Sequence, residues 1–148
     1  MSTRANVIIQ ETIDLSHYDR ANRIDRLYFY RHSDGYPEGV KETLDKFIEW
    51  VKKDKVRDNL SQSAGWLILL GAIEYNTIPK YKLEDPNPKW GTGYADMKTV
   101  GDPEDWKAGA YEPTTCIHGD IEHLYLVDIN KKEWREVPRK DWNKYDNK

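Results

Sequence analysis

One segment, from about Leu60 to Asn76, constrains the fold of this chain more than any other part of the sequence. Its apolar residues do not keep to one side of a helix but occupy nearly the whole circumference. A helix of this kind has to be covered on more than one side, so it is predicted to be the buried helix of the domain. The apolar residues are Ala64, Trp66, Leu67, Ile68, Leu69, Leu70, Ala72 and Ile73.

A second helix is predicted directly before it, from Pro37 to about Asp54. Apolar residues recur there at helical spacing while charged residues fill the other faces, which is typical of an amphipathic surface helix. A turn precedes this helix, because Gly35 tolerates positive φ, Pro37 suits the first helical position and Asp34 can cap backbone amides. The apolar positions are Val40, Leu44, Phe47, Ile48 and Val51.

Segments with the β-branched and aromatic content of strands stand on both sides of the helices. The order ββααβββ predicts an α+β fold in which an antiparallel sheet carries both helices on one face. We expect a single domain over residues 1–138, with a long loop at 77–113, and a charged tail at 139–148 that is docked by Trp142. The predicted strands are Asn6–Ile13, Arg26–His32, Thr114–His118, Ile121–Ile129 and Glu133–Val137.

Composition and charge exclude several classes of function. The net charge is only −3 and no long block of Lys or Arg is present, so extended nucleic acid is not an expected partner, whereas a small anionic ligand is compatible with the sequence. The single cysteine, Cys116, cannot form an internal disulfide, and no Cys/His cluster has zinc-finger spacing. The longest apolar stretch, Gly65 to Ile73, is too short to span a bilayer, and no signal peptide is recognisable. We therefore expect a cytoplasmic protein without cofactor or membrane partner.

The loop at 77–113 is rich in proline and contains Lys89, Trp90 and Tyr94 around two glycines. Loops of this length inside a compact domain are often binding elements. Trp90 and Tyr94 could stack on a nucleobase with Lys89 near a phosphate. The alternative is a glycine-containing turn whose aromatic residues fill gaps in the core.

Strand alternation sorts the aromatic residues by sheet face. Tyr28, Tyr30 and His32 lie opposite Leu27 and Phe29, and His123 and Tyr125 lie opposite Leu124 and Leu126. If the aliphatic rows cover the helices, the Tyr/His rows form a second surface suited to a subunit interface or a ligand. Ordinary cross-strand aromatic pairing is the alternative.

Two turns place a histidine two residues before an aspartate, and together they suggest an alternative site for a hard metal or for acid–base chemistry. No nucleophile elbow or phosphate-binding loop accompanies them, so catalysis is not the leading hypothesis. The alternative function is a metal-dependent phosphoesterase acting on a nucleotide. Its residues would be His32, Asp34, His118, Asp120 and Glu122.

Three segments carry a resemblance to a known group of proteins: Met1–Val7, Tyr30–Gly39 and Gly119–Tyr125. They resemble small phage and prophage proteins with a His-x-Asp-Gly-Tyr-Pro motif, in which Trp often stands where this chain has Ser33. The resemblance implies the phage sponge proteins that oligomerise and sequester cyclic-nucleotide alarm signals of bacterial defence, notably in CBASS immunity.

The sequence thus predicts a phage immune-evasion protein that binds a cyclic oligonucleotide in the host cytoplasm without cleaving it. A homo-oligomer is expected, since an amphipathic sheet face should find a partner. A protein-binding inhibitor of a host enzyme is the third hypothesis. We expect the aromatic residues to stack on the bases, Lys89 to contact a phosphate, and Asp34 and His32 to shape the turn. The predicted ligand-binding residues are Tyr28, Tyr30, His32, Asp34, Tyr36, Lys89, Trp90, Tyr94, His123 and Tyr125.

Overall fold

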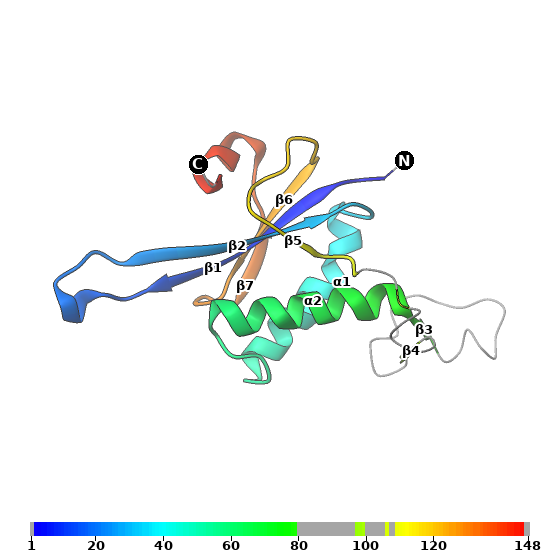
Figure 1. The fold of residues 1–148 in the computed structure, drawn as a ribbon, viewed down its shortest axis with the longest axis horizontal. Coiled ribbons are helices and arrows are strands. Elements are labelled where there is room, and N and C mark those ends of the chain that lie inside the picture. The colour runs from blue at the N-terminus through cyan, green and yellow to red at the C-terminus, as the bar shows by residue number, and fades with distance from the viewer. Residues whose placement is uncertain (1, 80–96, 100–105, 107–108, 147–148) are drawn as a thin grey trace.

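The computed structural model describes residues 2–79, 97–99, 106 and 109–146, and it contains a five-stranded sheet with two long helices (Figure 1). The strand order is β5-β2-β1-β6-β7. The helices are α1 (Pro37–Lys52) and α2 (Leu60–Asn76). The strands are β1 (Ala5–Ile13), β2 (Arg23–Arg31), β5 (Glu112–Thr114), β6 (His123–Asp128) and β7 (Glu133–Glu136).

The α+β class and the predicted order ββααβββ are confirmed, but the sheet is mixed. β1 pairs antiparallel with β2 and parallel with β6, which in turn forms a hairpin with β7. The short β5 pairs with the end of β2 and occupies residues 112–114, earlier in the chain than predicted. Within the predicted loop, β3 (Thr77–Pro79) and β4 (Met97–Thr99) form a separate two-stranded sheet.

Both helices lie on one face of the sheet, as predicted. α2 contacts β1 and β2, while α1 contacts β7 and packs beside α2. The core between these layers joins Val7 and Phe29 of the sheet to Leu44, Phe47 and Leu67 of the helices. No helix among the described residues is long and apolar enough to cross a membrane.

The other face of the sheet is also covered. Two 3-10 helices complete the described chain, η1 (Ser16–Tyr18) and η4 (Arg139–Tyr145). Trp142 and Tyr145 of η4 pack on a second apolar cluster, and Trp142 Nε1 donates to the carbonyl oxygen of Val137 at 2.9 Å. The predicted docking of the tail by Trp142 is therefore confirmed. This cluster contains Ile8, Tyr28, Tyr30, Ile121, Leu124, Leu126 and Val137.

The β1–β2 hairpin extends beyond the rest of the sheet as a two-stranded arm (Figure 1). Pairing between β1 and β6 ends at Gln10 and Asp128, so the outer residues 11–13 and 23–25 pair only with each other among the described strands. The side chain of Asn130 braces the base of the arm, accepting from the Thr12 amide at 2.7 Å and donating to the Thr12 carbonyl at 3.1 Å.

The prediction that α2 is buried all round is wrong for the described structure. Ala64, Leu67 and Leu70 are buried, but Ile68 and Leu69 keep 38% and 41% of their surface exposed. The reason is that only the sheet and α1 flank this helix among the long elements, so one side of an all-round apolar helix is left without a layer to cover it.

The Asp-Gly-Tyr-Pro turn has a local structural explanation. Asp34 adopts a left-handed φ of 56°, and Pro37 occupies the first turn of α1. A Cβ on Gly35 would lie 2.7 Å from the Cβ of Ala5, and one on Gly39 would lie 2.1 Å from the Asp34 carbonyl oxygen. The motif therefore specifies a tight connection between β2 and α1.

A buried ion pair links β2 to both helices. Arg31 is 1% exposed, and its guanidinium donates to both carboxylate oxygens of Glu74, at 3.1 and 2.6 Å, and to the carbonyl of Ser33 at 2.8 Å. The hydroxyl of Thr43 donates to the same carboxylate at 2.7 Å, and the ring of Tyr111 lies 5.1 Å from the guanidinium carbon. Burial opposes the charge of Arg31, but Tyr111 and Glu74 outweigh it and raise its pKa.

Candidate functional site

The aromatic platform predicted from strand alternation does not form, because its two halves face opposite sides of the sheet. Tyr28 and Tyr30 of β2 face η4, where they are 6% and 9% exposed. Tyr125 of β6 faces the helices, is fully buried, and donates its hydroxyl proton to the Gly35 carbonyl at 2.6 Å. The parallel register aligns Tyr125 with Val7, and this alignment places the Tyr/His row of β6 on the helix side. Burial raises the pKa of Tyr125, which keeps the phenol a donor.

The remaining predicted ligand residues are spread over the molecule. His123 lies on the helix side of β6, where its ring pairs with the carboxylate of Glu136 at 2.7 Å. Asp34 and Tyr36 are exposed in the turn before α1. The predictions for Lys89, Trp90 and Tyr94 lie outside the described residues.

The two histidine-containing turns do meet in space, where His118 contacts the ring of Tyr30 and His32 contacts its hydroxyl. The ring of His118 stacks on Tyr30 with the centroids 4.1 Å apart, and the Tyr30 hydroxyl lies 3.1 Å from Nδ1 of His32. Buried Asn6 holds His118 there, since its Oδ1 accepts from the His118 amide at 2.9 Å and its Nδ2 donates to the Phe29 carbonyl at 3.1 Å.

This meeting of the turns does not gather a set of metal ligands. Asp120 is exposed and forms an ion pair with Arg4 at 3.3 Å, while Asp34 and Glu122 are exposed. No three His, Cys, Asp or Glu side chains in the described part of the chain stand close enough together to hold one ion. The histidines here contact a tyrosine, which supports the structural interpretation of both turns.

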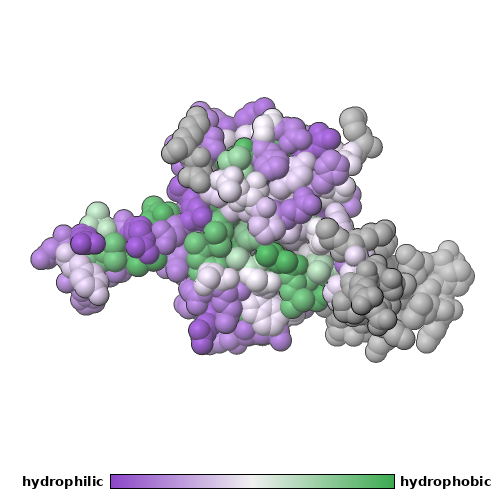
Figure 2. Space-filling model, viewed as in Figure 1, coloured by the Kyte–Doolittle hydropathy of each residue, from purple (hydrophilic) through white to green (hydrophobic). Residues whose placement is uncertain are grey.

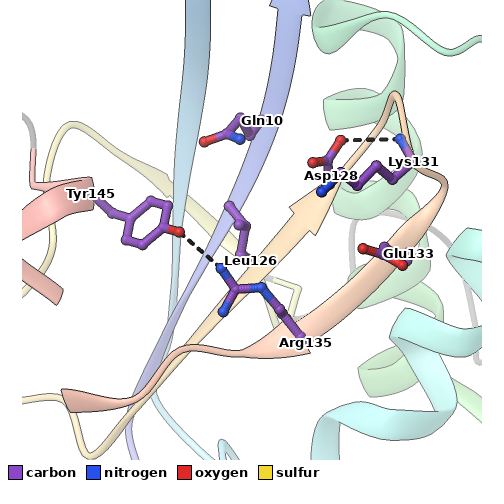
Figure 3. A pocket seen from close by; sticks show the side chains of 7 residues that line it. All are labelled: Gln10, Leu126, Asp128, Lys131, Glu133, Arg135 and Tyr145. Atoms are coloured by element: carbon purple, nitrogen blue, oxygen red, sulfur yellow. Dashed lines mark hydrogen bonds between the residues drawn. The ribbon is translucent and has the colours of Figure 1, made fainter. Parts of the chain in front are cut away.

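A pocket of about 170 Å³ opens on the face of the sheet that carries η4 (Figure 3). It lies over β1, β6 and β7 and is bounded by the end of the tail. Its walls are almost entirely polar, with one aliphatic residue at the base. The lining residues are Gln10, Leu126, Asp128, Lys131, Glu133, Arg135 and Tyr145.

Two arginines hold the aromatic wall of this pocket. Nη2 of Arg135 donates to the Tyr145 hydroxyl at 2.9 Å, as Figure 3 shows. The guanidinium carbon of Arg26 lies 5.0 Å from the centre of the same ring, and Arg26 Nε donates to Gln10 Oε1 at 2.8 Å. The Tyr28 hydroxyl donates to the Tyr145 carbonyl at 2.6 Å, and burial raises the pKa of Tyr28. Tyr145 is thus held through its hydroxyl, its ring and its backbone carbonyl.

The charges that line the pocket are mixed. Lys131 and Arg135 accompany Asp128 and Glu133, and one oxygen of Asp128 accepts from the Lys131 amide at 3.1 Å, while Arg26 adds a third cation through its contact with Tyr145. Guanidinium groups suit phosphate, because their planar fork of donors matches two phosphate oxygens. Carboxylates at the rim could accept from hydroxyl groups such as those of a ribose.

The sequence interpretation missed this site because its parts come from four separate segments. Gln10 lies in β1, Arg26 in β2, Arg135 in β7 and Tyr145 in the tail. Alternation does place Arg26 on the face of Tyr28, which was the one available signal. Comparison of the chain with protein-family models, with curated proteins and with solved structures found no match.

Proposed function

We propose that this protein binds a small phosphorylated ligand of the nucleotide class at the pocket lined by Arg135 and Tyr145, with Arg26 against the same tyrosine, and releases it unchanged. The observation that carries the proposal is that two arginines contact one tyrosine. Arg135 donates to the hydroxyl of Tyr145, Arg26 lies over its ring, and Lys131 also lines the pocket. Such a group offers charge-assisted donors to phosphate and an aromatic surface beside them.

Binding without turnover is proposed because of the residue types that line the pocket. Among the described lining residues there is no histidine, cysteine or serine to act as a nucleophile, and the two carboxylates, Asp128 and Glu133, share the pocket with the cations Lys131 and Arg135. The two histidines near each other, His32 and His118, are instead engaged with Tyr30.

The volume of the pocket limits what it encloses. Sites that engulf a small organic molecule usually measure about 300–1,000 Å³. At about 170 Å³ this one would take a phosphate with part of its sugar, and the rest of the ligand would lie along the surface.

A cyclic oligonucleotide is the first ligand to test, and the resemblance to phage sponge proteins supports this choice. A sponge would protect a phage by holding the bacterial alarm signal, so intact release is the property that distinguishes it from a phosphoesterase. The proposed biological role is therefore sequestration of a cyclic-nucleotide defence signal.

The test is to incubate the purified protein with cyclic di- and trinucleotides, measure binding by calorimetry, then heat the complex and identify the released nucleotide. We expect intact nucleotide, and a rise in melting temperature while it is bound. Cleaved nucleotide would contradict the proposal, as would the absence of binding to every member of the panel.

A matched pair of variants locates the site. Arg135→Ala removes a charge-assisted contact and is expected to weaken binding roughly 10- to 100-fold. Arg57→Ala removes an exposed arginine between the helices and is expected to leave affinity unchanged. Equal effects of the two substitutions would show that the pocket is not the binding site.

A further inference from the structure

The outer edge of β2 has a partner over only part of its length. β5 pairs with Tyr28, Phe29 and Tyr30, whereas no described strand pairs with residues 23–27 on that side. Every second residue of this five-residue stretch therefore presents its backbone N–H and C=O groups to the exterior. Such an edge is a template for pairing with another strand.

The uncovered part of α2 lies on the same side of the molecule. The segment 109–114 shows this, because it both pairs with β2 through β5 and packs on α2, where the Ala110 amide donates to the Gly71 carbonyl at 3.1 Å. The tight approach of Gly109 to Ala72 and of Tyr111 to Gly71 leaves no room for another layer there. In the preceding turns of α2, a Cβ on Gly65 would meet nothing within 4 Å.

Some of the residues left open along this side are apolar. Ile24, on the η4 face of β2, is 51% exposed, Leu27, on its helix face, is 37% exposed, and Ile68 of α2 is 38% exposed. Figure 2 shows hydrophobic residues gathered in a band that runs from the base of the arm across the middle of this view. An isolated two-stranded ribbon is marginally stable in water, so the arm itself would gain from a further strand.

We propose that a second copy of this chain occupies the free edge of the arm, with the two β2 strands pairing antiparallel across a twofold axis perpendicular to the sheet. One continuous sheet then runs through the dimer, and α2 and its copy lie on the same face of it. The interface is isologous, since the same patch is used twice. The inference is independent of the proposed ligand.

Charge complementarity selects this occupant and its register. When the twofold axis is perpendicular to the sheet, residues that lie opposite each other across the axis point to the same face of the sheet. One residue of β2 then lies opposite its own copy, and the axis is named by that residue. An axis through Asp25 sets Asp25 against its own copy, and an axis through Arg26 does the same for Arg26. Like charges directly opposite destabilise a strand pair. An axis through Ile24 instead sets Arg23 opposite Asp25 of the partner subunit, twice.

The environment of Asp25 fits this register. Within one chain it accepts from Arg23 Nε at 3.0 Å, but its cross-strand neighbour on β1 is Glu11, a second acid. One Oε of Glu11 is buried and has no hydrogen-bond partner among the described residues. Arg23 of the partner subunit would add a cation beside this pair of carboxylates, and Ile24 would be covered by its own copy.

The experiment measures mass in solution by sedimentation equilibrium. We expect wild-type protein at twice the 17.5 kDa of one chain. Arg23→Asp and Asp25→Arg each oppose like charges and should weaken dimerisation at least about tenfold. An equimolar mixture of the two variants restores opposite charges across the axis, so it should associate as heterodimers.

Two further variants make the result specific. Ile24→Lys should weaken the dimer while leaving the melting temperature of the subunit nearly unchanged, because this side chain is 51% exposed in one chain and lies opposite its own copy at the axis. Arg57→Asp, an exposed change in the turn between the helices, should have no effect on mass. Wild-type protein with the mass of one chain would overturn the proposal. A dimer that survives the charge variants, or variants that fail to associate when mixed, would do the same.

Discussion

Removing the carboxylate of Glu74 should destabilise the fold, because it leaves a buried cation without its counter-ion. Arg31 is 1% exposed, whereas the Glu74 side chain keeps 24% of its surface exposed. In Glu74→Ala the guanidinium loses both carboxylate contacts and keeps the Ser33 carbonyl and the face of Tyr111. The hydroxyl of Thr43 loses an acceptor in the same substitution.

The size of the effect follows from the burial of the two partners. Breaking a buried ion pair by removing one partner costs about 3–5 kcal/mol. Water can reach Arg31 through the space left by the partly exposed Glu74 and partly solvate its charge. The expected cost therefore lies at the lower end of this range, at about 3 kcal/mol. For a chain of this size each kcal/mol lowers the melting temperature by about 2–4 °C, so a fall of about 6–12 °C is expected.

Urea denaturation of wild type, Glu74→Ala and Glu49→Ala provides the assay. Glu49 is also a helical glutamate, but its pairs with Lys46 and Lys53 are on the surface, so its removal should cost much less stability than the removal of Glu74. The double variant Arg31→Met with Glu74→Leu should recover most of the loss, because no buried charge remains. Equal losses for Glu74→Ala and Glu49→Ala would refute the reasoning.

Three other perturbations test separate parts of the structure. Gly39→Ala should cost about 3 kcal/mol or more in urea denaturation, since its Cβ would lie 2.1 Å from a backbone oxygen, while Gly119→Ala, with open space around it, should be nearly neutral; similar losses would contradict this. Asn6→Ala should cost about 2–4 kcal/mol and release His118 from the Tyr30 ring, which an unchanged His118 ring resonance in NMR would disprove. Burial raises the pKa of Tyr28, Tyr30, Tyr75, Tyr111 and Tyr125 above the usual 10, so the folded state holds these protons more tightly than the unfolded chain. The stability they contribute is complete below pH 10 and is lost as pH rises above it. A free energy of unfolding that stays constant in that range would be the contrary result.

The helices were predictable because their signals are local. Pro37 and the apolar spacing after it marked α1, and the continuous apolar run marked α2 with the bounds that the structure has. The direction of pairing between β1 and β6 was not predictable, because more than a hundred residues separate these strands and alternation carries no information about direction. The register was not predictable either, and the register, which aligns Tyr125 with Val7, is what places Tyr125 on the helix face.

The site was harder to predict than the fold because it depends on how the tail is placed. Trp142 indicated that the tail docks, but only the folded chain shows that Tyr145 then meets Arg26 and Arg135. Conversely, His32, Asp34 and Tyr36 were predicted to bind the ligand because they belong to a recognisable motif. Their part of the chain builds the turn between β2 and α1.

A crystal structure of the protein grown with a cyclic dinucleotide is the most direct test of the proposed function. We expect a phosphate of the ligand within hydrogen-bond distance of Arg135 and Arg26, its phosphodiester bonds intact and its sugar near Asp128 or Glu133. A nucleotide bound elsewhere, for example over His32, with the Arg135–Tyr145 pocket occupied only by solvent, would contradict the account.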